Sequence, residues 1–77
     1  MTRSPDASAN AISLQVNGET KTCMAGTPLP DFLVQVGLNP KLVAVEYNGA
    51  IVPRPLWEKT QLQAGDRLEI VTIVGGG

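Results

Sequence analysis

A chain of 77 residues has room for one domain with one modest hydrophobic core. Six basic and seven acidic residues give a net charge of −1, and because the basic residues are scattered singly, nucleic acid is excluded as the main partner. One cysteine cannot form an internal disulfide, which favours a reducing cytoplasm, and together with the absence of histidine it excludes His-based catalysis and a structural zinc site. The lack of a long apolar run argues against a membrane span.

The first secondary-structure signal is a hairpin. It is preceded by residues 1–10, which are polar, lack the apolar segment of a signal peptide and are expected to form a disordered lead. Apolar residues then alternate with polar ones, as in a half-buried strand: Ile12, Leu14 and Val16. Asn17-Gly18 is a strong hairpin-turn signal, so residues 19–24 are predicted to return as the second strand.

A short helix is expected after the break at Ala25-Gly26. Thr27 can cap a free amide at its start, and Pro28 suits the first helical position, where its missing N–H costs nothing. The apolar residues that follow have helical spacing and form one face: Leu29, Phe32, Leu33 and Val36. Gly37 favours the left-handed conformation that ends a helix.

Two further strands are expected beyond a loop at Asn39-Pro40. The alternation over residues 43–47 predicts the third strand, and Asn48-Gly49 predicts a tight turn. Residues 50–52 then return as a brief fourth strand, which ends before two prolines that have no N–H to donate.

The last part of the chain predicts a central strand. Residues 56–59 are expected to form a helical turn and residues 64–66 a second turn. Residues 68–74 are almost continuously apolar, which is typical of a strand covered on both faces in the middle of a sheet. The order of elements predicts an α+β fold of the ubiquitin-like β-grasp type over residues 11–74, a mixed sheet of four to five strands with one helix packed across a face.

Residues 75–77 are three glycines, expected to form a flexible tail beyond the last strand. Glycine runs at chain ends are common linkers, but this run directly follows a strongly hydrophobic strand, which favours a functional tail. A tail without β-carbons passes through a narrow channel and adopts whatever backbone angles an enzyme site requires, and it reaches about 10 Å when extended. The candidate working group is therefore the carboxylate of Gly77, with Gly75 and Gly76 threading into a partner's active site.

The sequence resembles the ThiS family of thiamine-biosynthesis sulfur carrier proteins over residues 12–77. The order and spacing of several short stretches carry this resemblance: Val16-Asn17-Gly18-Glu19, Val43 to Gly49, Ile51-Val52-Pro53-Arg54, Trp57, Leu62, Gly65-Asp66, Leu68 to Val71, and Val74-Gly75-Gly76-Gly77.

The resemblance implies a role as a protein co-substrate with no catalytic residue, metal or bound cofactor of its own. It implies that a ThiF-type adenylating enzyme uses ATP to activate the Gly77 carboxylate. Sulfur from a cysteine desulfurase relay would then give a thiocarboxylate, from which a ThiG-type thiazole synthase takes the sulfur. Five residues are candidates for the partner interface: Tyr47, Ile51, Arg54, Ile73 and Val74.

Simpler roles are expected for the remaining conspicuous residues. Cys23 is interpreted as a small core residue rather than a sulfur relay, and Trp57 as a lid over the core. Asp66 is expected to form a turn with its own backbone, and the exposed Arg54 to contribute little to the fold. Three carboxylates are interpreted as a solvated face: Glu46, Glu58 and Glu69.

Three alternatives remain open on the residues alone. The small subunit of molybdopterin synthase shares the fold and the diglycine end, although the first turn and the Val-Pro-Arg segment resemble the thiamine carrier better. A ubiquitin-like protein modifier would use the same tail to form isopeptide bonds. A plain interaction domain would carry an idle tail, so that removing Gly76 and Gly77 would change nothing.

Overall fold

The computed structural model describes residues 10–73. Residues 1–9 of the expected lead, Val74 and the glycine tail lie outside the described residues. Asn10, the last residue of that lead, is described, and its carbonyl accepts a hydrogen bond from the Ala25 N–H at 2.7 Å.

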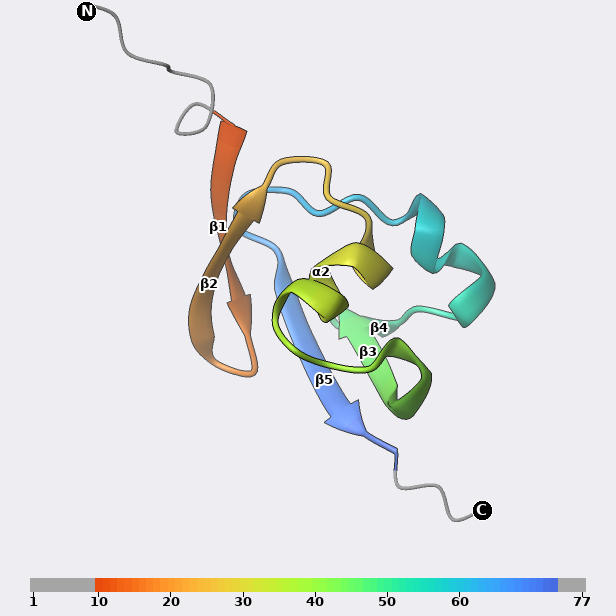
Figure 1. The fold of residues 1–77 in the computed structure, drawn as a ribbon. Coiled ribbons are helices and arrows are strands. Elements are labelled where there is room, and N and C mark those ends of the chain that lie inside the picture. Colours follow the sequence, from red (N-terminus) through yellow and green to blue (C-terminus); the bar gives the residue numbers. More distant parts are fainter. Residues whose placement is uncertain (1–9, 74–77) are drawn as a thin grey trace, which may run out of the picture.

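The predicted hairpin is confirmed. Strands β1 (Ala11–Val16) and β2 (Glu19–Met24) pair antiparallel along their whole length (Figure 1). Asn17 and Gly18 between them have φ angles of 52° and 85°. A two-residue hairpin turn with both central residues in the left-handed region matches the twist of the strands, which is why the Asn-Gly pair indicated it.

The helix α2 (Leu29–Gln35) begins one residue later than expected, and its predicted cap is wrong. Pro28 is the capping residue and no side chain caps the helix. The Thr27 hydroxyl instead donates to the Met24 carbonyl at 2.6 Å, while Pro28 is held extended by an isolated β-bridge to Gln61. Because that long-range bridge fixes the backbone before the helix, the local capping preference of Thr27 is overridden.

The end of α2 follows the sequence. Gly37 has a φ of 87°, and its N–H donates to the Val34 carbonyl at 3.0 Å. The Leu38 N–H donates to the Leu33 carbonyl at 2.9 Å, which completes a Schellman motif. The partly buried Leu38 side chain also packs against the core.

The elements after α2 differ from the prediction mainly at their ends. The expected loop at Asn39-Pro40 leads into a 3₁₀-helix, η1 (Pro40–Leu42), because the Asn39 side chain accepts a hydrogen bond from the Lys41 N–H. The other bounds are β3 (Val43–Tyr47), β4 (Ala50–Ile51), the 3₁₀-helix η2 (Arg54–Lys59) and β5 (Arg67–Thr72).

The five strands form a mixed sheet in the order β2-β1-β5-β3-β4, with α2 across one face (Figure 1). Strand β5 runs parallel to β1 and antiparallel to β3, so the predicted central position of the last strand is confirmed. A hairpin, a helix crossing one face and a returning central strand make up the predicted β-grasp arrangement.

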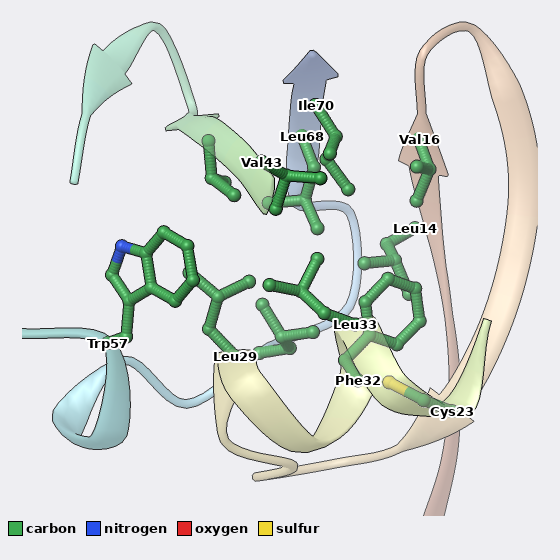
Figure 2. Packing of buried hydrophobic residues seen from close by; sticks show 12 residues of the cluster. Leu14, Val16, Cys23, Leu29, Phe32, Leu33, Val43, Trp57, Leu68 and Ile70 are labelled. Atoms are coloured by element: carbon green, nitrogen blue, oxygen red, sulfur yellow. The ribbon is translucent and has the colours of Figure 1, made fainter. Parts of the chain in front are cut away.

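The core lies between α2 and the sheet, and Figure 2 shows its side chains with Trp57 at one end and Cys23 toward the other. The three apolar residues of α2 that face the sheet are fully buried: Leu29, Phe32 and Leu33. Trp57 is a lid, as predicted, and its indole N–H donates to the Val52 carbonyl at 2.8 Å. The buried indole therefore leaves no unpaired donor.

The second face of β5 does not have the coverage that its apolar sequence predicted. Leu68 and Ile70 point into the core, but Val71 is 61% exposed and Ile73 is 45% exposed. Successive side chains of a strand point to opposite faces, and the α-helix of residues 10–73 covers one of them. The apolar residues of the other face are thus left open.

Candidate functional site

Strand β5 carries the chain toward the predicted tail. At its end the Ile73 N–H donates to the Leu42 carbonyl at 2.6 Å, one residue beyond the pairing of Thr72 with Val43. The predicted sulfur-loading residue, Gly77, lies outside the described residues together with the rest of the tail. The structure therefore describes the end of β5, from which the tail starts. The candidate site consists of the residues that hold this end of the strand.

The asparagine of the first turn holds β5 over a long sequence distance. The Asn17 side chain accepts from the Ile70 N–H at 2.7 Å and donates to the Ile70 carbonyl at 3.0 Å. Strand β1 pairs with β5 only at Gln15 and Val16, so the Asn17 amide continues the ladder where β1 has turned away. The sequence indicated the turn but not this bond, since glycine or aspartate would satisfy the turn equally well.

The second Asn-Gly turn makes a similar contact. Asn48 also has a φ of 52°, and its side-chain oxygen accepts from the Arg67 N–H at 2.8 Å. Its side-chain amide donates to Asp66 at 3.2 Å. Both asparagine turns thus fix the central strand by side-chain hydrogen bonds. The sequence signal for this is that both turns use asparagine, whose side chain has a donor and an acceptor.

Asp66 is a hydrogen-bond centre at the start of β5. Its side chain is buried, and as predicted it accepts from a nearby backbone N–H, that of Gln63, at 2.8 Å. It also accepts from the Tyr47 hydroxyl at 2.6 Å, which sequence reasoning missed. Tyr47 lies on the helix side of the sheet, so its hydroxyl serves this internal bond and does not project from the open face.

The Tyr47–Asp66 bond predicts a loss of stability at alkaline pH. Burial, the bond to Asp66 and the Asp66 charge raise the pKa of Tyr47 from 10 to about 12. A tyrosine with a raised pKa in the folded state stabilises the fold fully below pH 10, and that contribution is lost as the pH rises from 10 through about 12.

Urea unfolding at several pH values tests this with Tyr47→Phe as the comparison. The variant should cost about 1.5–3 kcal/mol at pH 7, because it removes a hydrogen bond to a charged group. The difference between the two proteins should shrink between pH 10 and about 12, since tyrosinate then faces the Asp66 carboxylate. A difference that stays constant over this range would contradict the prediction.

Arg54 is placed differently from the other predicted interface residues. It begins η2, and its guanidinium turns toward backbone carbonyls of the chain itself and lies over the Trp57 ring, 4.6 Å from the ring centroid. The expectation that this arginine contributes little to the fold is wrong, because long-range carbonyl partners were not visible in the sequence.

The open face of the sheet brings one predicted interface residue, Ile51, next to Val71. Ile51 is 71% exposed and lies on the edge strand β4, and Val71 lies in β5. A second predicted interface residue, Ile73, follows the last residue of β5 and is 45% exposed. A shallow hollow of about 110 Å³ lies here, lined by Ala44, Val45, Glu46, Ile51, Glu69 and Val71. We call the three residues of the open face that line this hollow with apolar side chains, Ala44, Ile51 and Val71, the apolar patch; Ile73 lies beyond it.

Two of the three predicted solvated carboxylates border this patch. Glu46 and Glu69 are directly opposite each other on β3 and β5, and both are exposed. They also line a second hollow with Arg67, next to the Asn48-Gly49 turn. Glu58 lies apart from them on η2, so the three do not share one face.

Cys23 is a core residue, as interpreted from the sequence. Its side chain is buried in β2, and burial raises the pKa of the thiol, which disfavours the nucleophilic thiolate. Within residues 10–73 there is no cluster of three or more His, Cys, Asp or Glu that could hold a metal ion. In the same range no helix has the length and apolar character needed to cross a membrane.

The comparisons with known proteins agree with this geometry. The model of the ThiS family matches residues 14–77. The fold superposes on the crystal structure of the thiamine biosynthesis protein ThiS from Geobacter metallireducens with a TM-score of 0.73 and 28% identity, over 86% of this chain and 100% of that one.

Similar sequences come from two kinds of protein. The uncharacterized protein ycf40 of Pyropia yezoensis is 42% identical over 66 residues, which cover 86% of this chain and 93% of that protein. The thiazole synthase of Magnetococcus marinus is 39% identical over the same length, but the match covers only 20% of that enzyme. One kind of relative is thus as small as this chain, and the other contains a similar segment within a larger protein.

Proposed function

Because the chain belongs to the ThiS family, the sulfur carriers of thiamine biosynthesis, we propose that it carries sulfur for thiazole formation on the carboxylate of Gly77. The observation that carries the proposal is the family match, which runs through the glycine residues to Gly77. The described fold supports it, because the central strand β5 is fixed along its length and leads directly toward these glycines.

The proposed chemistry takes place in partner enzymes. In the first step the Gly77 carboxylate attacks the α-phosphate of ATP, so that pyrophosphate leaves and an acyl adenylate forms in a ThiF-type enzyme. In the second step the outer sulfur of a persulfide supplied through a cysteine desulfurase relay attacks the acyl carbon, and AMP leaves, so that an acyl disulfide forms. In the third step a thiol of the relay attacks the S–S bond of this acyl disulfide, which releases the thiocarboxylate and leaves the thiol oxidised in a disulfide. The chain itself supplies no catalytic side chain to any of these steps.

A thiazole synthase is the proposed acceptor of the sulfur. The thiazole synthase of Magnetococcus marinus and that of Paramagnetospirillum magneticum each contain a segment similar to this chain over 20% of their length. A carrier-like segment within the enzyme that uses the sulfur supports the idea that the separate carrier serves the same enzyme. The free, buried thiol of Cys23 supports a reducing compartment, the cytoplasm, for this cycle.

The apolar patch is proposed as the surface on which the partner enzymes dock. Exposed apolar side chains that lie together on a small domain commonly mark a binding surface. Glu46 and Glu69 face each other beside the patch, and Arg67 lines the second hollow with them, so this border carries two acidic groups and one basic group. We therefore expect the docking surface of the partner to combine apolar residues with an arginine or lysine that complements the excess negative charge.

Intact-mass measurement tests the proposed function. The protein is incubated with ATP, a cognate adenylating enzyme and a sulfur donor, and the C-terminal fragment is then isolated and weighed. We expect one oxygen to be replaced by sulfur in the fragment that contains Gly77, and the loaded protein to support turnover by a thiazole synthase. Sulfur found only on Cys23, or a stable conjugate to another protein, would contradict the proposal.

A further inference from the structure

Arg54 makes a set of contacts that is unusual for an exposed side chain. One terminal nitrogen, Nη1, donates to the Pro40 carbonyl at 2.7 Å. The other, Nη2, donates to the Val43 carbonyl at 2.9 Å and more weakly to the Lys41 carbonyl at 3.4 Å. A planar guanidinium presents its donors in a fixed fork, so one arginine can hold several carbonyls of a short turn in a defined geometry.

These carbonyls surround the residue that holds the end of β5. They belong to η1 and to the first residue of β3, on both sides of Leu42 in the sequence. The Leu42 carbonyl is the acceptor for the Ile73 N–H at 2.6 Å. Leu42 itself is 49% exposed, so burial of its side chain does little to fix its position. Its backbone is held on one side by the buried Val43, which pairs with Thr72, and on the other side by the hydrogen bonds to η1.

Arg54 is in turn anchored in the core. Its guanidinium lies over the ring of the buried Trp57, and a cation over an indole face is favourable. The Trp57 indole donates to the Val52 carbonyl, which fixes the ring. A continuous set of contacts therefore runs from the core through Arg54 and η1 to the Ile73 amide, four residues before Gly77.

We propose that Arg54 is a positioning residue that fixes where the chain leaves the sheet, and thereby how the Gly77 carboxylate enters the adenylating enzyme. This inference depends on the proposed function. Reactions at a bound group are sensitive to displacements of about 1 Å, because the reacting atoms have to be held in near-attack geometry. A less firmly held strand end at Ile73 would leave docking through the apolar patch intact but would place the Gly77 carboxylate less accurately in the adenylating enzyme.

Three variants test the proposal. Arg54→Gln removes the charge and most of the fork, and Arg54→Lys keeps the charge but presents only a single ammonium group. Lys59→Gln is the matched control, because it removes a positive charge from the same 3₁₀-helix at an exposed position.

Hydrogen exchange provides a readout that needs no partner enzyme. In Arg54→Gln the Ile73 amide should exchange at least about tenfold faster than in the wild type, while the Ile70 amide, bonded by Asn17, keeps its protection. Equal acceleration at both amides would mean general destabilisation and would overturn the proposal, as would unchanged protection at Ile73.

Adenylation kinetics provide the second readout, at a temperature where all variants are folded. For Arg54→Gln we expect kcat to fall about tenfold with the KM for the carrier within twofold of wild type, and Arg54→Lys to recover only part of the loss. Full recovery by lysine, a purely KM effect or an equal loss in Lys59→Gln would overturn the proposal. If the wild-type protein is itself not adenylated, the proposed function fails, whereas the exchange result at Ile73 still decides whether Arg54 fixes the strand end.

Discussion

Removing Gly76 and Gly77 is expected to abolish sulfur loading and to leave the unfolding free energy unchanged. The core and the bonds that fix β5 lie within residues 10–73, so the truncation removes no described contact of the fold. It does remove the proposed acceptor carboxylate and shortens the reach of the tail by about 7 Å. Loading is measured by intact mass and stability by urea unfolding.

A semisynthetic chain that ends in a primary amide at Gly77 sharpens this test. The amide keeps the length and residues of the tail but lacks the carboxylate that attacks ATP. We expect it to bind the adenylating enzyme as a competitive inhibitor and to acquire no sulfur. Loading of either altered protein at the wild-type rate would support an idle tail and the plain interaction domain.

Placing a charge in the apolar patch is expected to weaken docking strongly. Val71→Asp should raise the KM for the carrier about 10- to 100-fold, because a carboxylate would have to be desolvated against the apolar surface of the partner. The kcat at saturating carrier should change little, since the substitution alters neither the tail nor the end of β5 from which it starts. Adenylation is measured by pyrophosphate release over a range of carrier concentrations.

Val34→Asp is a matched control for this experiment. Val34 is 63% exposed and Val71 is 61% exposed, but Val34 lies on α2, on the other side of the sheet. The two variants make the same chemical change at equal exposure, and thermal unfolding shows whether both remain folded. An equal effect on KM from both, or no effect from Val71→Asp, would exclude the open face as the docking surface.

The apolar patch and Arg54 are proposed to act at different stages: the patch in docking to the adenylating enzyme, and Arg54 in positioning the Gly77 carboxylate. A patch variant is expected to act on KM, and an Arg54 variant on kcat. This separation follows from the structure, because the patch lies on the open face while the Arg54 contacts run along η1 to the end of β5.

Local pattern was sufficient for much of the fold. The alternation around Leu14 and the Asn17-Gly18 turn predicted the first hairpin, and Gly37 predicted the end of α2. Local pattern was insufficient where two preferences competed. Thr27 is a good capping residue, yet its hydroxyl bonds to Met24 because a distant bridge holds the backbone before the helix.

The strands, the α-helix, the Asn-Gly turns and the family could be predicted from the amino-acid sequence, because these depend on periodicity, on residues that tolerate positive φ and on short motifs in a fixed order. The partners of the polar side chains could not be predicted, because they depend on how the chain folds in three dimensions. Asn17 bonds to Ile70 across 53 positions, and Arg54 reaches Pro40 across 14. Asn17 and Ile70 become neighbours only when β5 inserts between β1 and β3, and Arg54 and Pro40 only when η2 lies beside η1, so no local pattern encodes either proximity. The same holds for the open face of β5, whose apolar residues have the composition of a covered strand and lie exposed because the helix packs on one side.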